Sequence, residues 1–395
     1  MYSTDSNKSV SSLDYDFFSK ELRCFLQSFS ITIYKPPHLN VESKFYMLCP
    51  IFPKLVTANG GDKMSPISPP RHEINGGRTI PFRGALGTLM RTPRNLLLTV
   101  LGWSGDAPTF TIEAFDPRMN RWFYVSQQGF IKRAYHGVVM LGVLIYVIGG
   151  YDGRICFDTV FCFNVETREW YRRSSLHVPR CYATCLVYRG QVYVMGGFDG
   201  EERLRSCEMF DQDIRNWKYL ASMNEIRSDA SGAVHKGKIF MCGGFNGIDV
   251  LTSVEIYDIE QDHWTIVGHM LSPRSGHVMI SYKSVLLIMG GYDGEDRLRS
   301  VERYDDAESK WRSHVPMLSR RSNFAAAILD DKIYVIAGYN GYTTFTQVEE
   351  YDDISQKWKW SKGINKHRSA HGACVFQDTM TISMCTSTGK QKPIN

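Results

Sequence analysis

Short apolar runs of four to six residues recur along this 395-residue chain from residue 96 onward, and each leads into a glycine. The runs are rich in β-branched and aromatic residues, and none has the 3.6-residue period of an amphipathic helix. Such runs predict strands that are buried on both faces and followed by tight turns, which glycine permits. They cover residues 96–101, 143–148, 192–195, 239–242, 285–289 and 333–337.

A single tryptophan follows each run at a fixed distance. Successive tryptophans are 48 residues apart once and 47 residues apart four times, and a glycine pair stands 21 residues before each of the middle four. Leu101-Gly102 and Ala337-Gly338 hold the same place in the outer copies. A period this strict indicates one structural unit copied six times. The tryptophans are Trp122, Trp170, Trp217, Trp264, Trp311 and Trp358.

The rest of the unit predicts a four-stranded antiparallel meander. A leading arginine stands before the apolar run, and an Asp-Gly or Asn-Gly turn follows most of the glycine pairs. Seven residues before each tryptophan an aromatic residue is followed by Asp or Asn, which favours the turn into a fourth strand. The leading arginines of the successive units are Arg133, Arg180, Arg227, Arg274, Arg321 and Arg368.

One such sheet cannot bury both of its faces, whereas four-stranded sheets repeated around an axis can, as in a propeller. The pattern from the glycine pair through the aromatic-Asp step to the tryptophan resembles the kelch repeat over roughly residues 94–384. The chain is similar to the kelch-like (BTB-kelch) family. We therefore expect an all-β, six-bladed kelch β-propeller.

The two ends of the repeat region complete each other. The first copy lacks an arginine-led strand, while residues 368–376 supply such a strand with no full copy after it. We expect this C-terminal strand to pair with the first run and close the ring, which removes two open sheet edges. The expected domains are a poorly structured leader over residues 1–94 with one short helix, the propeller over 95–385, and a flexible tail over 386–395.

Charge and composition exclude several classes of partner. Residues 1–94 carry 12 Lys+Arg and 7 Asp+Glu, which accounts for the net charge of +5 and leaves the propeller region neutral. No concentrated basic stripe is present, so nucleic acid is not an expected partner. No membrane helix or secretory signal is recognisable, and we expect no membrane association and a cytoplasmic location. The ten cysteines are expected to be reduced thiols.

Catalytic chemistry is not expected. No nucleophile elbow or phosphate-binding loop occurs in the sequence. His136, His277 and His371 hold one slot in three different copies, three residues after the leading arginine, as strand residues near the axis would. The sequence therefore predicts a non-catalytic binding protein without a cofactor or a metal.

The repeats also indicate where a partner would bind. A position identical in all copies serves the scaffold, whereas an asymmetric partner must contact loop positions at which the copies differ. The segments after the glycine pairs and those after the leading arginines are expected on one face. The candidate residues there are Tyr151, Tyr182, Phe198, Arg203, Ser228, Asp229, Phe245, Ser275, Tyr292, Arg297, Ser322, Asn323, Tyr339 and Ser369.

In kelch-type ligase adaptors, the resemblance implies, such positions contact a peptide segment of the target protein. Arg203 and Arg297, surrounded by aromatic residues and flanking the uncharged Phe245 and Val250, suit a short acidic peptide with one apolar anchor. The alternative is that the aromatic residues only cap the tops of the blades.

Two functions are hypotheses at this point. The resemblance implies a protein–protein interaction module that acts as substrate-recognition adaptor of a Cullin-3-type E3 ubiquitin ligase and promotes target ubiquitination and proteasomal degradation. Many family members carry BTB and BACK domains, which residues 1–94 cannot both hold. Cullin-3 would then be reached either directly or through a partner subunit that supplies the BTB domain. The alternative is a cytoskeletal kelch protein that binds actin.

Overall fold

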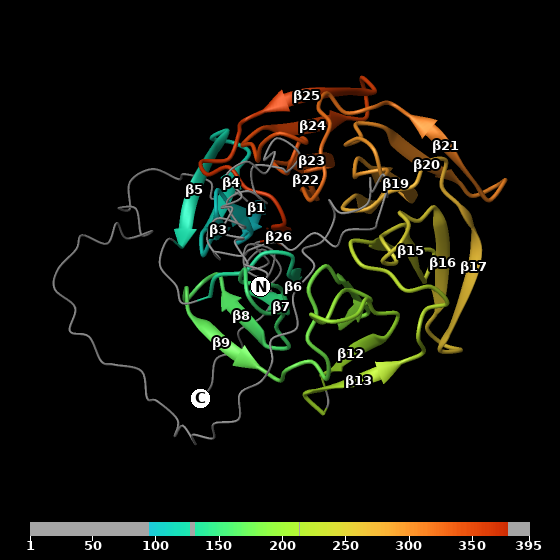
Figure 1. Ribbon diagram of the computed structural model, residues 1–395. Coiled ribbons are helices and arrows are strands. Elements are labelled where there is room, and N and C mark those ends of the chain that lie inside the picture. The colour runs from blue at the N-terminus through green and yellow to red at the C-terminus, as the bar shows by residue number, and fades with distance from the viewer. Residues whose placement is uncertain (1–94, 127–130, 213, 378–395) are drawn as a thin grey trace, which may run out of the picture.

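Each predicted apolar run forms the second strand of a four-stranded antiparallel sheet. The computed structural model describes residues 95–126, 131–212 and 214–377, and its six four-stranded sheets stand around a common axis (Figure 1). This arrangement confirms the all-β, six-bladed propeller. The predicted leader over 1–94 and tail over 386–395 lie outside the described residues.

The blades follow one another along the chain, and their colours run around the ring in Figure 1. Blade 1 consists of β26 (Gly372–Gln377), β1 (Asn95–Val100), β4 (Ile112–Asp116) and β5 (Arg121–Ser126), with the small ribbon β2 (Trp103–Ser104) and β3 (Ala107–Pro108). Blade 2 consists of β6 (Gly137–Leu141), β7 (Leu144–Ile148), β8 (Val160–Asn164) and β9 (Trp170–Arg173). Blade 3 consists of β10 (Thr184–Tyr188), β11 (Gln191–Met195), β12 (Cys207–Asp211) and β13 (Asn216–Leu220).

The remaining blades repeat the same order. Blade 4 consists of β14 (Ser231–His235), β15 (Lys238–Cys242), β16 (Ser253–Asp258) and β17 (His263–His269). Blade 5 consists of β18 (Val278–Tyr282), β19 (Val285–Met289), β20 (Val301–Asp305) and β21 (Lys310–His314). Blade 6 consists of β22 (Ala325–Leu329), β23 (Lys332–Ile336), β24 (Val348–Asp352) and β25 (Lys357–Ser361). The first strand of each blade lies nearest the axis, and the fourth lies at the outside (Figure 1).

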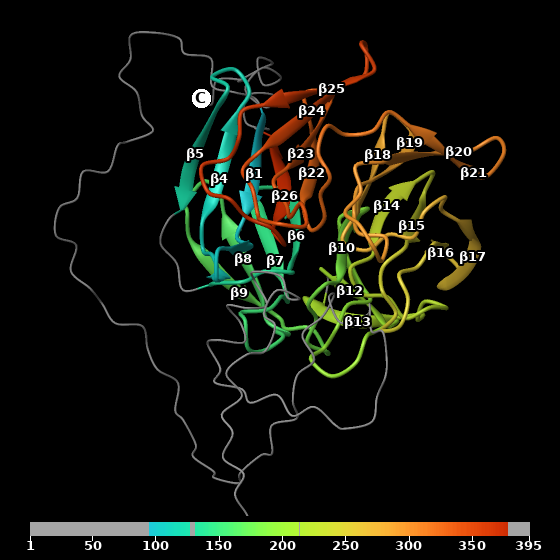
Figure 2. The same cartoon turned by 45° about the horizontal axis from the view of Figure 1, so that its top comes forward.

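The ring closes as predicted, through the C-terminal strand. β26 pairs antiparallel with β1 over six residues, from Asn95 opposite Gln377 to Val100 opposite Gly372. The red and cyan strands of blade 1 accordingly lie side by side in Figure 2. This pairing gives β1 strand neighbours on both sides, so β1 itself has no open edge.

The tryptophans and the aromatic residues opposite them pack the fourth strand of each blade against its third strand. In blade 3, Trp217 stands opposite Phe210 in the strand register, and their ring centroids are 5.3 Å apart. Trp217 Nε1 donates a hydrogen bond to the Ser174 carbonyl of blade 2 at 2.9 Å. One apolar cluster fills each junction between neighbouring blades, including the junction of blades 6 and 1. The repeated tryptophan therefore joins two blades as well as two strands.

The two positions of the glycine pair differ in their backbone conformation. The first has φ between 50° and 63°, and Leu101 and Ala337 adopt it in blades 1 and 6. The second has φ between 97° and 105° and is glycine in all six blades. A Cβ atom on Gly150 would lie 2.7 Å from that of His136. The second glycine is therefore required both by its conformation and by the close approach of the neighbouring segment.

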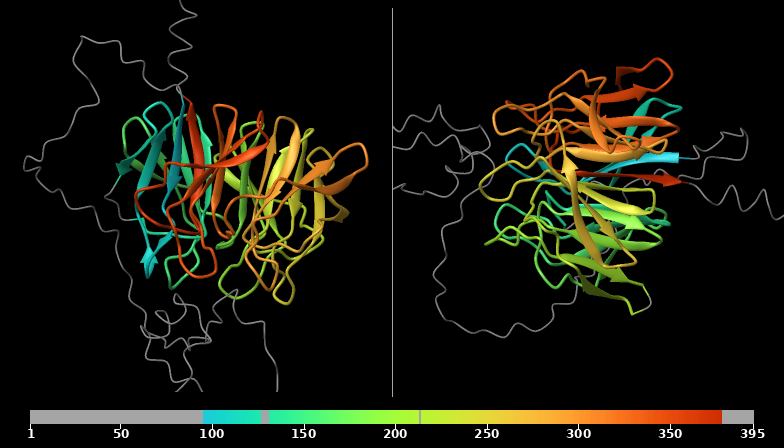
Figure 3. Two further views of the ribbon diagram at one scale, coloured as in Figure 1. Left: turned by 90° about the horizontal axis from the view of Figure 1, so that it is seen from above. Right: turned by 90° about the vertical axis from the view of Figure 1, so that its right-hand side faces the viewer.

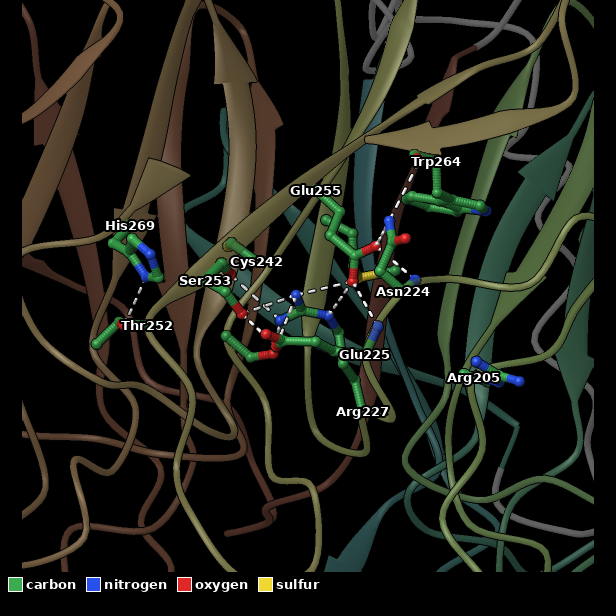
Figure 4. A network of polar contacts seen from close by, with 12 residues as sticks. Arg205, Asn224, Glu225, Arg227, Cys242, Thr252, Ser253, Glu255, Trp264 and His269 are labelled. Carbon is green, nitrogen blue, oxygen red and sulfur yellow. Dashed lines mark hydrogen bonds and ion pairs between the residues drawn. The ribbon is translucent and has the colours of Figure 1, made fainter. Parts of the chain in front are cut away.

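The leading arginines are buried scaffold residues. In blade 4, Arg227 Nε and Nη2 donate to Glu255 Oε1 at 3.1 and 2.9 Å, and Nη1 donates to the Gly243 and Ser253 carbonyls (Figure 4). Equivalent Arg–Glu pairs occur in blades 1, 3, 5 and 6. Each pair ties the segment that enters a blade to the third strand of that blade.

Blade 2 departs from this pattern. Phe161 stands where the other blades carry the glutamate, and Arg133 stacks on Phe157 and Phe161 with its guanidinium carbon 4.2 and 5.1 Å from the ring centroids. Burial lowers the pKa of Arg133 to about 10. The blade keeps its arginine through cation–π contacts and carbonyl hydrogen bonds in place of an ion pair.

Candidate protein-binding face

The two predicted loop sets meet on one face of the propeller. In blade 4, the segment after the leading arginine pairs with the segment after the glycines, because Ser228 and Phe245 exchange backbone hydrogen bonds of 3.0 and 2.8 Å. The equivalent residues pair in every blade. We call the end of the propeller formed by these segments the upper face. The loops at the two ends of the propeller are seen from the side in Figure 3.

A closed circle of backbone hydrogen bonds surrounds the axis at the upper face. One residue from each blade takes part, and each donates its N–H to the carbonyl of the residue in the preceding blade at 2.7–2.9 Å. All six have left-handed backbones with φ between 49° and 58°. We call these residues the mouth ring: Tyr135, Tyr182, Asp229, Gly276, Asn323 and Ala370.

The side chains of the mouth ring are asymmetric. Tyr135 and Tyr182 pack together with ring centroids 4.2 Å apart, which makes one side of the mouth aromatic. Across the ring from them stand Gly276 and Asn323, and Ala370 follows beside Tyr135. A Cβ atom on Gly276 would lie 2.5 Å from Asn323 Oδ1, so glycine makes room for the amide group. Such a surface can distinguish the two ends of a bound segment.

Arg203 is held at the seam between blades 3 and 4. Its guanidinium carbon lies 5.4 Å from the ring centroid of Phe198 in blade 3 and 4.6 Å from that of Phe245 in blade 4. Arg203 Nε also donates to Ser228 Oγ at 3.2 Å. The side chain is thus positioned by aromatic rings and a hydroxyl of two different blades.

Arg297 repeats this arrangement at the seam between blades 5 and 6. Its guanidinium carbon lies 4.3 Å from the ring centroid of Tyr292 and 5.0 Å from that of Tyr339, and its Nε donates to Ser322 Oγ at 3.4 Å. Blade 4 carries Val250 in the equivalent position, so an uncharged seam separates the two arginines. We call Arg203 and Arg297 the clamped arginines.

The structure divides the predicted site residues into two layers. Five are partly exposed: Tyr182, Arg203, Asp229, Arg297 and Asn323. Nine are buried beneath them: Tyr151, Phe198, Ser228, Phe245, Ser275, Tyr292, Ser322, Tyr339 and Ser369. Six of the buried residues support the clamped arginines from below: Phe198, Ser228, Phe245, Tyr292, Ser322 and Tyr339. A ligand on the upper face would therefore contact the partly exposed group directly.

Sequence reasoning missed the tips of the upper loops. The tips of blades 2, 4 and 6 carry Ile155, Ile248 and Tyr342, which are 58%, 72% and 85% exposed. The tips of blades 3 and 5 carry the exposed acidic pairs Glu201-Glu202 and Glu295-Asp296. Apolar and acidic tips therefore alternate around much of the rim. The signal in the sequence was the difference between copies at the positions three and two residues before Phe157, Leu204, Leu251, Leu298 and Phe345.

Asp229 is the acidic residue of the mouth ring. Loss of hydration raises the pKa of Asp229 to about 7, and the positive charge of Arg203 opposes this rise. A carboxyl group that is partly protonated at neutral pH repels an incoming anion less than a fully ionised one does. Asp229 can also donate a hydrogen bond in its protonated form.

The three axial histidines are neutral and belong to separate blades. Burial lowers the pKa of His136 and His277 to about 3 and places that of His371 well below its ordinary value. Within residues 95–126, 131–212 and 214–377, no group of three or more His, Cys, Asp or Glu side chains is placed to hold a metal ion. The same part of the chain contains no helix of the length and apolarity needed to cross a membrane.

Comparison with known families agrees with the repeat pattern. Residues 97–270 match the KLHDC2/KLHL20/DRC7 kelch-repeats domain, and residues 273–318 and 320–359 each match the kelch motif. The structure is also similar to that titled "Structure of YjhT", with a TM-score of 0.56 and 13% sequence identity over 67% of this chain and 96% of the other. At this level of identity the likeness concerns the fold alone.

Three relatives from Caenorhabditis elegans share short segments with the chain. Kelch repeat-containing protein kel-10 is 32% identical over 98 residues, and Kelch repeat and BTB domain-containing protein F47D12.7 is 33% identical over 98 residues. Spermatocyte protein spe-26 is 30% identical over 112 residues. These segments cover 24%, 24% and 28% of this chain, and only 17%, 17% and 20% of the relatives.

Proposed function

From the kelch-repeat propeller that its residues 97–359 form, we propose that this chain captures a protein target by a short peptide segment at the upper face. The segment carries a central acidic side chain that the clamped arginines bind, and an apolar anchor that packs between them. The adaptor role is the second part of the proposal: in the cytoplasm, the bound target is presented to a Cullin-3-type ubiquitin ligase.

The observation that supports target binding most directly is the clamping of Arg203 and Arg297. A guanidinium stacked between rings of two blades loses little conformational freedom on binding, and its planar group of donors matches a carboxylate. The Nε of each arginine donates a hydrogen bond to a serine hydroxyl of the next blade. The fold thus prepares two cations on either side of an uncharged seam.

The loop tips restrict which acidic segment can bind. Glu201 and Glu202 stand on the same upper loop as Arg203, and Glu295 and Asp296 stand on that of Arg297. Because like charges repel, an extended acidic tract would be disfavoured at the rim even though a single acid is favoured at the centre. We propose a ligand with one central acidic residue flanked by uncharged or basic residues.

The ligase part rests on the family resemblance. Residues 227–231, 243–247 and 345–349 look most like kelch-like protein 10 within the BTB-kelch family. One relative that shares a segment with this chain is a kelch repeat and BTB domain-containing protein. We propose that a BTB-containing partner links the propeller to Cullin-3 and leads to ubiquitination and proteasomal degradation of the target.

Peptide display tests target binding. A randomised peptide library is selected on the wild-type chain and on the double variant Arg203→Ala/Arg297→Ala. We expect the wild type to enrich peptides with one central acidic residue and an apolar neighbour, and the double variant to lose this enrichment. Mainly basic peptides, or identical selections on both proteins, would remove the clamped arginines from the site.

Affinity purification tests the adaptor role separately. The tagged wild-type chain and the tagged double variant are isolated from cells treated with a proteasome inhibitor. We expect Cullin-3 and a BTB protein with both baits, and the target with the wild type alone. Absence of Cullin-3 and of any BTB protein would reject the ligase role and leave the binding role in place.

Actin binding is the alternative partner that the same repeats allow. Sedimentation with filamentous actin distinguishes it from peptide capture, because the wild-type chain should remain in the supernatant if the proposal holds. Pelleting that weakens in the Arg203→Ala/Arg297→Ala variant would replace the adaptor hypothesis with the cytoskeletal one.

A further inference from the structure

Two thiols meet at the upper seam between blades 2 and 3. Cys156 ends the upper loop of blade 2, and Cys181 follows the leading arginine of blade 3, yet their Sγ atoms lie 2.9 Å apart. A disulfide needs a sulfur–sulfur distance of about 2.05 Å, so a movement of about 1 Å or less would join them. A bond here would connect two neighbouring blades.

The fold places this pair of positions together in other blades as well. The same two positions hold Arg203 and Ser228 at the seam of blades 3 and 4, and Arg297 and Ser322 at the seam of blades 5 and 6, with side-chain hydrogen bonds of 3.2 and 3.4 Å. The contact between Cys156 and Cys181 is therefore an outcome of the repeat geometry. At the seam of blades 2 and 3 these two positions hold two cysteines in place of an arginine and a serine.

The two thiols differ in accessibility. Cys181 is 1% exposed and packs with Tyr151 and Phe198 in an aromatic cluster, whereas Cys156 lies at the edge of that cluster and is partly exposed. An external disulfide can therefore reach Cys156 before Cys181. This order matches that of an attacking thiol and a resolving thiol in thiol–disulfide exchange.

We propose that Cys156 and Cys181 form a reversible disulfide that links blades 2 and 3 at the upper face. The oxidant is a small disulfide such as oxidised glutathione. The Cys156 thiolate attacks one of its sulfur atoms, forms a mixed disulfide and releases one glutathione thiolate. The Cys181 thiolate then attacks Cys156 Sγ and releases the second glutathione. Two protein thiols are oxidised, and one glutathione disulfide is reduced to two thiols, with two protons transferred from the protein.

Other cysteines among the described residues are less suited to this chemistry. Burial raises the pKa of Cys185, Cys207 and Cys374 to about 12, which keeps them as unreactive thiols. Cys242 Sγ contacts His277 Nε2 at 3.2 Å and Met279 Sδ at 3.7 Å inside the core. Cys207 Sγ and Cys242 Sγ donate to the backbone carbonyls of Arg205 and Ser231.

The test is to equilibrate the full chain in mixtures of reduced and oxidised glutathione, quench it in acid, alkylate it and digest it. We expect a Cys156–Cys181 linked peptide, located by fragmentation, that forms under oxidising mixtures and disappears under reducing ones. The linked protein should melt about 5 °C higher, because the bond closes a 25-residue loop. Complete alkylation of both thiols after oxidising treatment would overturn the proposal.

Variants test the order of attack and separate it from general oxidation. Cys181→Ser should accumulate one glutathione on Cys156, and Cys156→Ser should leave Cys181 unmodified. Cys185→Ala, four residues from Cys181, should still form the link. The double variant Cys156→Arg/Cys181→Ser recreates the contact of blades 3 and 5 and should fold without a redox-dependent melting shift. Glutathione on Cys181 in Cys156→Ser, or a link lost in Cys185→Ala, would contradict the assignment.

Discussion

Arg368 and Glu113 form a buried ion pair although 255 residues separate them in the sequence. In blades 3 to 6 the same pair joins an arginine to a glutamate 28 residues later. Blade 1 takes its arginine from the C-terminal end of the propeller and its glutamate from the N-terminal end. The closing blade is therefore held by side chains as well as by the pairing of β26 with β1.

Removal of the closing carboxylate should destabilise the whole ring. Glu113→Ala leaves Arg368 buried without its carboxylate partner and removes the side-chain oxygen that accepts a hydrogen bond from the Asn365 backbone N–H. We expect a loss of about 3–5 kcal/mol in the free energy of unfolding, measured by denaturant titration. Glu260→Ala removes an exposed carboxylate 3.9 Å from Arg189 and should cost less than about 0.5 kcal/mol. Equal losses would contradict the closing role of Glu113.

Truncation tests the same closure at the level of the strand. Deletion of residues 366–395 removes β26 and exposes one edge of β1. We expect aggregation or rapid proteolysis, because an unpaired strand edge is a template for association. Deletion of residues 1–85 is the control, and it should leave thermal unfolding of the propeller unchanged. A stable monomer after the first deletion would mean that the ring does not depend on this pairing.

Repeated and unrepeated residues should differ in their effect on stability. Trp217→Ala removes a side chain that is 3% exposed and packed between two blades, so it should cost about 3–5 kcal/mol. Arg203→Ala removes a partly exposed side chain with cation–π contacts and one hydrogen bond, and should cost about 1 kcal/mol. Both values follow from denaturant unfolding, and similar losses would reject the division between scaffold and site.

Acid should destabilise the propeller through its buried histidines. Burial and the nearby Arg274 and Arg227 lower the pKa of His277 to about 3, whereas an unfolded histidine titrates near 6.5. The unfolded state therefore binds a proton that the folded state excludes, so stability present above pH 6.5 is lost as the pH falls toward 3. Between pH 7.5 and 5.5 this single group should account for about 1.4 kcal/mol.

His277→Phe isolates this contribution, because Phe324 holds the same slot in blade 6. We expect the variant to lose about 1.4 kcal/mol less stability than the wild type between pH 7.5 and 5.5. Asp229 titrates in the same range in both proteins, so its effect cancels in the difference. Parallel stability profiles for the two proteins would show that His277 is not held neutral by the fold.

The period of the repeat predicted most of the fold, because equivalent positions form the same strands and pack in the same way in every blade. The apolar run at residues 285–289 coincides with β19, and the predicted closing strand is β26. The conformation of the mouth ring was not predictable in this way. Tyr135, Tyr182 and Ala370 adopt left-handed backbones that their residue types do not favour, because hydrogen bonds to the neighbouring blades impose them.

The location of the candidate site was predictable from the sequence, but the contacts between its residues were predictable only in part. Comparison of the copies placed Arg203 and Arg297 at variable loop positions on one face. It could not show that Phe198 and Phe245 lie under Arg203, since that contact joins two blades across a seam. It also could not show that Cys156 lies beside Cys181, because that contact crosses the seam between blades 2 and 3.

Calorimetric titration of a selected acidic peptide tests the central claim most directly. The wild-type chain should bind with micromolar affinity, on the order of −8 kcal/mol. Arg203→Ala should weaken binding by about 1.5–3 kcal/mol, or roughly tenfold to a hundredfold, and so should Arg297→Ala. The matched control is Arg205→Ala/Arg299→Ala, which removes two exposed arginines from the same two blades. It should bind nearly as tightly as the wild type. Equal weakening by the control and by Arg203→Ala/Arg297→Ala would mean that general charge, and not the clamped arginines, attracts the peptide.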